Sequence, residues 1–177
     1  VYVEDGAVGA ASGGDVFSLA AGQLILHAPM VFHRIWAAQN TTPTVIILSF
    51  SARNLSVFGS RVYTADSAFQ PEFRSLLNEI YHAFHIQSDL HVTGVNDAAA
   101  AALAVNHLER LLQSVTAVAP LDARDLSASA EQFREIMAIF EAHLADALSV
   151  PQLAALCRMS ESAMKKCVAR YTGLGVM

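Results

Sequence analysis

The chain has 177 residues, of which 54% are hydrophobic and only 15% are charged. This composition excludes a disordered protein, because a chain of this kind can bury a sizeable core. No apolar run reaches the roughly 18 residues that a membrane-spanning helix needs, so no membrane partner is expected.

The formal net charge of −5 is spread unevenly along the chain. Residues 148–177 carry four basic side chains and one acidic side chain, whereas the remainder carries seven basic and fifteen acidic side chains. An acidic body with a basic end indicates that a nucleic acid would bind this end alone. The two cysteines, Cys157 and Cys167, are too few for a secreted disulfide scaffold and favour a reducing cytosol.

The first 65 residues predict a β-rich domain. Short runs of β-forming residues alternate with Gly, Pro, Asn and Asp at a spacing of about 8–12 residues, which is typical of an antiparallel barrel or sandwich. The predicted strands cover residues 1–3, 16–19, 23–27, 32–38 and 44–50. Because Val1 falls inside the first strand, we expect further residues upstream of it.

Residues 66–118 predict a pair of helices, one over 69–86 and one from about 96 to 118. Apolar residues recur at spacings of three and four in both, and Asn96 or Asp97 would cap the second helix. One side of the second helix would either pack on its own domain or form a homodimer with another copy. The residues of this candidate dimer seam are Leu108, Leu111, Leu112 and Val115.

Residues 119–129 predict a linker, because they contain Pro, Asp and Ser without apolar periodicity. Three helices should follow within residues 130–177. The first, over 130–144, would be capped by Ser129. The second would run from Ser149 to about Cys157, with Pro151 in its first turn, where a missing N–H costs nothing.

The third helix of this region should run from a capping Ser160 to Thr172 and stop at Gly173. Its apolar residues would form one stripe: Met164, Cys167, Val168 and Tyr171. Ser162, Lys165, Lys166 and Ala169 would lie on the opposite face.

In the preceding helix, Leu153, Leu156 and Cys157 are expected to point inward. Ala154 is small enough to let the two helices cross closely. The pattern predicts a helix-turn-helix whose second helix is free to enter a DNA major groove. The alternative is an ordinary helical hairpin within a core.

The stretch LSVPQLAALCRMSESAMKKCVARYTG, residues 148–173, resembles the first helix-turn-helix of the AraC/XylS family of bacterial transcription regulators. The family pattern is a leucine-alanine pair, a short turn, a capping serine, a recognition helix and a threonine-glycine. The matching residues are Leu153, Ala154, Ser160, Thr172 and Gly173. Two positions depart from the pattern: Arg158 stands where the turn usually has Gly, Asn or His, and Val168 stands where Phe is usual.

The stretch LAAGQLILHAPMVFHRI, residues 19–35, resembles the cupin-like sensor domain of the same family. The resemblance implies an α+β protein. A cupin-like antiparallel β-barrel sensor would cover 1–65 and a dimerising helical pair 66–118. The linker would cover 119–129 and an all-α subdomain with the first helix-turn-helix 130–177. The family's second helix-turn-helix is not in this chain, so we expect the chain to be part of a longer protein.

The resemblance implies a sequence-specific regulator of transcription in the bacterial cytoplasm, with double-stranded DNA and a small-molecule effector as partners. It implies no catalytic residues and no cofactor. Base contacts would come from Ser162, Lys165 and Lys166, next to the capping Ser160, and Arg170 would contact a phosphate.

His27, His33 and Trp36 are the candidate ligand-binding residues of the β-rich domain, although core packing would explain them equally. Metal-binding cupins use clustered histidines and a carboxylate. The five residues between His27 and His33 do not fit the tight spacing of such a cluster, and no acidic residue follows closely. The sequence therefore predicts no metal site. The competing hypothesis is a metal-dependent cupin enzyme with a structural helical tail.

Overall fold

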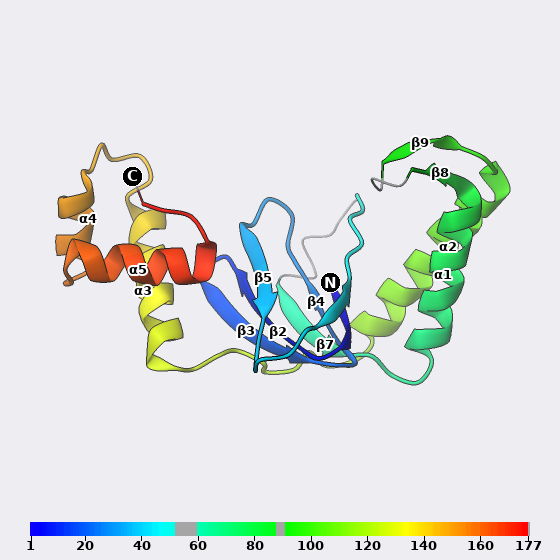
Figure 1. Cartoon of the computed structure of the whole chain (residues 1–177), viewed down its shortest axis with the longest axis horizontal. Coiled ribbons are helices and arrows are strands. Elements are labelled where there is room, and N and C mark those ends of the chain that lie inside the picture. The colour runs from blue at the N-terminus through cyan, green and yellow to red at the C-terminus, as the bar shows by residue number, and fades with distance from the viewer. Residues whose placement is uncertain (52–59, 88–90, 177) are drawn as a thin grey trace. The chain divides into compact units, whose positions relative to one another are not determined.

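The computed structural model describes residues 1–51, 60–87 and 91–176 and divides into two compact units (Figure 1). The first unit joins Val1–Val62 to Leu121–Met177, and the second unit is Tyr63–Pro120. Both helices and antiparallel strands are present, which confirms the α+β class.

The strands of the first unit form two sheets and do not close into a barrel within the described residues. One sheet has the order β6-β1-β4-β7 and the other has the order β3-β2-β5. Their bounds are β1 Tyr2–Asp5, β2 Ala7–Ser12, β3 Asp15–Ala20, β4 Gln23–Leu26, β5 His33–Ala37, β6 Thr44–Ile46 and β7 Arg61–Thr64. The expectation of a closed barrel is therefore corrected to a pair of sheets.

A hydrophobic core formed by both sheets joins them. Its buried members are Val3, Val8, Ala10, Phe17, Leu19, Ile25 and Val62. Ile35 of β5 and Val45 of β6 pack against this core. Since side chains alternate between the two faces of a strand, the neighbours of these residues point away from the core.

Strand β2, which the sequence did not predict, lies at the centre of the three-stranded sheet and is buried along its whole length. Val8 and Ala10 face the core between the sheets. Gly9 and Ala11 face the other way, and a Cβ at Gly9 would lie 2.3 Å from the ring of Trp36. Small residues are needed here because other groups approach both faces of the strand closely.

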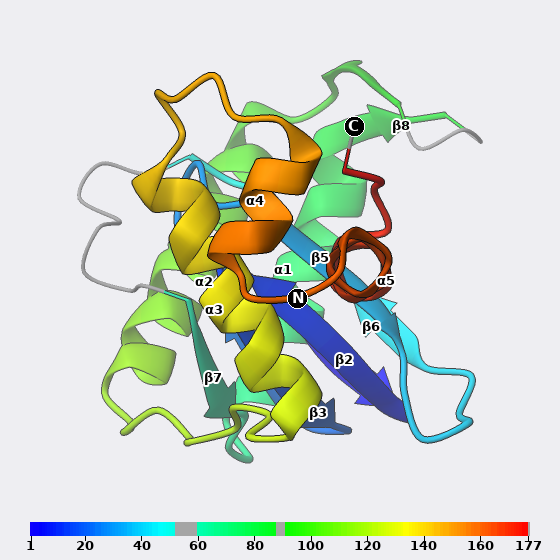
Figure 2. The ribbon, with the colours of Figure 1, turned by 90° about the vertical axis from the view of Figure 1, so that its left-hand side faces the viewer.

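Helices α3 (Ala128–Ala142), α4 (Val150–Leu156) and α5 (Glu161–Thr172) lie over the face of the three-stranded sheet that points away from the core (Figure 2). Ala11 and Val16 from the sheet share a second hydrophobic core with these helices. The helical members of this second core are Ala130, Phe133, Ile136, Ala154, Met164, Cys167, Val168 and Tyr171. The C-terminal helices thus belong to the same compact unit as the sheets.

The predicted linker over 119–129 is bound to the sheets by backbone hydrogen bonds. Leu121 N donates to Val62 O at 2.8 Å, and Asp125 N donates to Val16 O at 2.7 Å. Ser18 N donates in turn to Ala123 O at 3.0 Å. A run of polar residues without apolar periodicity can thus add its backbone to the edge of a sheet.

Helix α3 begins earlier than predicted, with Ser127 rather than Ser129 as its N-cap. The Ser127 hydroxyl accepts a hydrogen bond from Ala130 N at 3.3 Å. The helix also ends earlier, at Ala142, and Leu144 beyond it is 82% exposed.

The second unit contains helices α1 (Phe69–Ala83) and α2 (Ala98–Thr116) and a hairpin of β8 (Phe84–Ile86) and β9 (Val92–Val95). The predicted helix over 69–86 is therefore too long, because its last three residues pair with β9. Asp97 caps α2, as predicted, by accepting hydrogen bonds from Ala99 N and Ala100 N at 2.8 and 3.2 Å.

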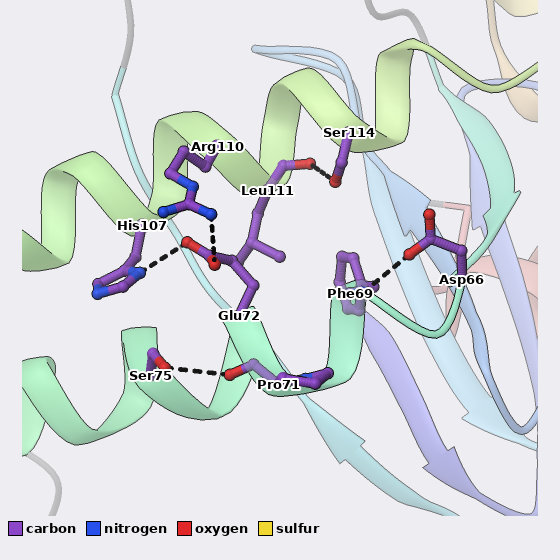
Figure 3. Close-up of polar contacts among 9 residues, drawn as sticks. All are labelled: Asp66, Phe69, Pro71, Glu72, Ser75, His107, Arg110, Leu111 and Ser114. Carbon is purple, nitrogen blue, oxygen red and sulfur yellow. Dashed lines mark hydrogen bonds and ion pairs between the residues drawn. The ribbon is translucent and has the colours of Figure 1, made fainter.

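A polar contact joins α1 and α2 (Figure 3). Oε1 of Glu72 lies 2.7 Å from His107 Nδ1, and its other oxygen lies 3.3 Å from the Arg110 guanidinium. In the described part of the chain, no helix combines the length and the apolar character needed to cross a bilayer.

Candidate nucleic-acid interface

Helix α5 has the bounds and ends that the sequence predicted. Ser160 accepts a hydrogen bond from Ala163 N at 3.2 Å, and Gly173 ends the helix in the left-handed conformation with φ of 72°. The predicted apolar stripe is buried: Met164, Cys167, Val168 and Tyr171 are each at most 8% exposed. Its burial fixes which face of α5 remains in contact with solvent.

Helix α4 begins with a reciprocal cap. The side-chain oxygen of Gln152 accepts hydrogen bonds from the backbone N and the hydroxyl of Ser149, at 2.8 and 2.7 Å. Ala154 is 2% exposed and lies in the core that α4 shares with α5, as its small size predicted. Leu156 is 43% exposed, so the prediction that it points inward was wrong.

The turn between α4 and α5 places Arg158 in the left-handed conformation with φ of 54°. Arg158 N donates to Ala155 O, and Met159 N donates to Ala154 O. These two bonds form the Schellman motif, which satisfies the last carbonyls of a helix and usually has Gly at the left-handed position. An arginine there costs about 1–2 kcal/mol of backbone energy.

The solvent-facing side of α5 is basic and polar. Ser162, Lys165 and Lys166 are exposed in its first turns. Lys165 lies 3.9 Å from Glu161, an ion pair in which both side chains are about half exposed. Such a pair contributes little to stability, since water screens it, so Lys165 can change partner at low cost.

Arg170 lies near the other end of α5 and is exposed, but its guanidinium already has contacts. It is 3.3 Å from the Ser129 hydroxyl and 5.5 Å from the ring centre of Tyr171. Tyr171 also donates its hydroxyl to Ser129 at 2.9 Å. Ser129, which the sequence assigned to a helix cap, instead binds α5 to α3.

The three candidate ligand residues do not share one site. His33 and Trp36 are three residues apart on β5, so they point to opposite faces of the sheet. Trp36 packs against the core of the C-terminal helices, and its ring meets Tyr171 edge-on with the centroids 6.0 Å apart. Of the two explanations that the sequence left open for Trp36, this contact favours core packing.

His27 and His33 do lie together, with their rings stacked at a centroid distance of 4.3 Å. His27 Nδ1 is 3.0 Å from the Ser12 hydroxyl, which is 2.7 Å from the hydroxyl of Ser60. The Nε2 atom of His27 is buried and has no hydrogen-bond partner among the described residues. Burial, followed by the charge of His33, lowers the pKa of His27 to about 4, so this ring is neutral at pH 7.

No group of three or more metal-ligating side chains comes together in residues 1–51, 60–87 and 91–176. Among these residues, no third ligand joins the stacked pair of histidines. Both cysteines are free thiols, and burial raises the pKa of each. A raised pKa disfavours the reactive thiolate form.

The residues of the candidate dimer seam differ in exposure. Leu111 and Val115 are 4% and 5% exposed in the single chain, so they belong to the core of the second unit and cannot form a solvent-facing seam. Leu108 and Leu112 are partly buried. Leu103 and Val105, at 47% and 54% exposed, are the large apolar side chains that α2 presents to solvent.

One residue that contacts α5 was missed from the sequence. Arg34 lies on β5, and its Nη1 donates to the backbone carbonyl of Arg170 at 2.9 Å. The available signal was its spacing of two from Trp36, which places both on one face of a strand. No protein-family model matches this chain, and comparison with curated proteins and with solved structures gave no match either.

Proposed function

We propose that this protein is a sequence-specific DNA-binding regulator of transcription of the AraC type. In this proposal α4, the turn at Arg158 and α5 form the helix-turn-helix, and α5 is the recognition helix. The observation that carries the proposal is the division of α5 into two faces. Its apolar stripe is buried, while Ser162, Lys165 and Lys166 remain exposed in the first turns.

The first turns of a recognition helix are the part that reaches base edges in the major groove. Lysine can donate to the two acceptors of guanine, and a serine hydroxyl can bond to several bases. Arg170 lies further along α5 and would contact a phosphate, which adds affinity without sequence information. Its contacts with Ser129 and Tyr171 would orient the guanidinium for this purpose.

The proposal includes a small-molecule effector that binds at His27 and His33. Support comes from the buried His27 Nε2, which offers a polar atom with no partner among the described residues. A buried polar atom of this kind costs free energy until a ligand or water satisfies it. The two sheets would then act as a sensor related to the cupin-like domain, in the bacterial cytoplasm.

A homodimer formed through the second unit also belongs to the proposal. Leu108 and Leu112 remain candidates for its seam, and the exposed Leu103 and Val105 extend the apolar surface of α2. Two-fold symmetric regulators bind two half-sites, so a dimer would make twice as many DNA contacts as a single chain.

The test is selection of sites from a pool of random duplex DNA, followed by binding measurements at several salt concentrations. Lys166→Ala should reduce discrimination at one or two base pairs by about 1–3 kcal/mol, because a base contact is lost. Arg170→Ala should weaken all sites similarly and reduce the salt slope by about one unit.

The matched control is Arg124→Ala, which removes an exposed arginine from the first unit outside α5. If no sequence is selected, or if both α5 variants behave like this control, the assignment of α5 as a recognition helix is wrong.

A further inference from the structure

The three-stranded sheet contacts the last turn of α5 through two side chains of β5. Arg34 donates a hydrogen bond to the carbonyl oxygen of Arg170 at 2.9 Å. Trp36 lies against Tyr171, and the Arg34 guanidinium lies 6.0 Å from the centre of the Trp36 ring. Both residues point away from the core between the sheets and toward the C-terminal helices.

The position of Arg34 suits the C-terminal end of a helix. The last carbonyls of a helix have no partner within it and carry partial negative charge, so a guanidinium is stabilised there. Gly173 leaves room for this contact: a Cβ at that position would lie 2.9 Å from Cζ of Arg34. Glycine at 173 therefore both ends α5 and admits the arginine.

A second charged contact joins the same sheet to α3. Arg134 Nε donates to Oδ1 of Asp15 at 2.9 Å, and Asp15 is the first residue of β3. Between the two contacts lie Ala11 and Val16 of the sheet, which share a core with Phe133 and Tyr171. The sheet thus holds α3 and α5 by a hydrophobic centre and by a separate arginine for each helix.

We propose that the outer face of the sheet β3-β2-β5 is a docking platform, and that Arg34 is a positioning residue that sets the orientation of α5. The platform holds the C-terminal turn of α5 and leaves Ser162 and Lys166 in solvent. The role of Arg34 in DNA binding rests on the proposed function; the docking itself does not.

Docking is measured without DNA, in the whole chain, by two probes. Trp36 is the single tryptophan, so its emission reports exposure of the platform. Exchange of the Gly173 amide reports opening of the last turn of α5. Arg34→Gln should shift the emission to longer wavelength and speed this exchange about tenfold, as expected for loss of one charge-assisted hydrogen bond.

Arg34→Lys should restore part of the protection, because it keeps a charged donor near the helix end. Arg124→Gln, the matched control, should leave the emission and the exchange rate as in the wild type, since the exposed Arg124 side chain pairs with the nearby Asp122 and not with α5 in the described part of the chain. Wild-type emission and exchange in Arg34→Gln would overturn the docking.

The positioning role is measured on the DNA sites selected as above. Arg34→Gln should weaken DNA binding several-fold, because a misplaced α5 fits the groove less well. The salt slope should stay constant, because Arg34 itself contacts no phosphate in this proposal. Wild-type affinity in a variant that has undocked would refute positioning. If the wild type selects no DNA, the proposed function fails, while the emission and exchange data still decide the docking.

Discussion

His27 shows how the surroundings of one side chain set its chemistry. Its ring is partly buried, is stacked on His33 and reaches the Ser12 hydroxyl through Nδ1. Burial opposes the charged form of the ring, and a positive charge on His33 would oppose it further, so the pKa falls from 6.5 to about 4. The ring therefore acts as a neutral hydrogen-bonding group over the physiological range of pH.

The depressed pKa of His27 predicts a specific dependence of stability on pH. Between about pH 6.5 and pH 4 the unfolded chain binds a proton at His27 and the folded protein does not. The free energy of unfolding should therefore fall as the pH is lowered through this window. After allowance for solvent screening of a partly exposed ring, the loss is about 1–2 kcal/mol.

Urea unfolding at pH 7 and pH 4.5 measures this effect. His27→Gln should have a flatter pH profile than the wild type, whereas His82→Gln, at an exposed position of α1, should keep the wild-type profile. Equal pH dependence in all three proteins would contradict the assignment.

At the scale of elements, β2 determines how closely the sheet and the C-terminal helices pack. The strand is buried on both faces, between the core of the two sheets and the core of the helices. Gly9 pairs with Trp36 across the ladder, and the indole ring covers the place of a Cβ. The strand therefore has small residues where a strand of average composition has Val or Ile.

Gly9→Ala tests this close approach. The added methyl would lie 2.3 Å from the Trp36 ring, so the ring must move or the strands must separate. Overpacking of this kind costs about 1–3 kcal/mol. Chemical denaturation should show the loss, and the emission of Trp36 should change at the same time. The control is Ser18→Ala, because Ser18 is exposed on the neighbouring strand β3. Gly22→Ala would not serve as a control, because Gly22 has φ of 82° and a side chain there would strain the backbone.

An unchanged free energy of unfolding in Gly9→Ala would show that the Trp36 ring can leave its place freely. That result would also count against close packing of the C-terminal helices on the outer face of the sheet.

At the scale of the whole molecule, the chain alternates between its units. It begins in the sheets of the first unit, forms the second unit over Tyr63–Pro120, and returns with the segment 121–177. The returning segment pairs its backbone with Val62 and Val16 before α3 begins. The sheets and the C-terminal helices are therefore expected to unfold together.

The exposed apolar residues of α2 give a test of the proposed homodimer. Leu103→Asp combined with Val105→Asp should give a folded monomer, because both side chains are about half exposed in the single chain. Leu111→Asp should instead unfold the second unit, since this side chain is 4% exposed and a buried unpaired charge is costly. Light scattering gives the mass and circular dichroism gives the fold.

If the Leu103 and Val105 double variant has the same mass as the wild type at all concentrations, this surface is not the seam. In that case the mass of Leu108→Asp, at a partly buried position of the same helix, is measured. A mass below that of the wild type would place the seam further along α2, and a wild-type mass equal to that of one chain would show a monomer.

The amino-acid sequence by itself determined the local structure of the C-terminal region. Ser149, Ser160 and Gly173 mark the ends of α4 and α5, because capping depends on a side chain and the few residues beside it. The buried stripe of α5 and the small Ala154 were likewise predictable, since helical periodicity repeats within a few turns.

Only the tertiary structure decided what depends on contacts between distant segments. β2 was missed because its alanines and glycine have low strand propensity. What places it in a sheet is packing against Trp36 on one face and against the core between the two sheets on the other. β8 was read as helix because pairing with β9 outweighs the local pattern. The spacing of three between His33 and Trp36 indicates their opposite directions only once β5 is known to be a strand. The contact of Arg34 with α5 spans 136 positions of the chain, and no local sequence pattern specifies it.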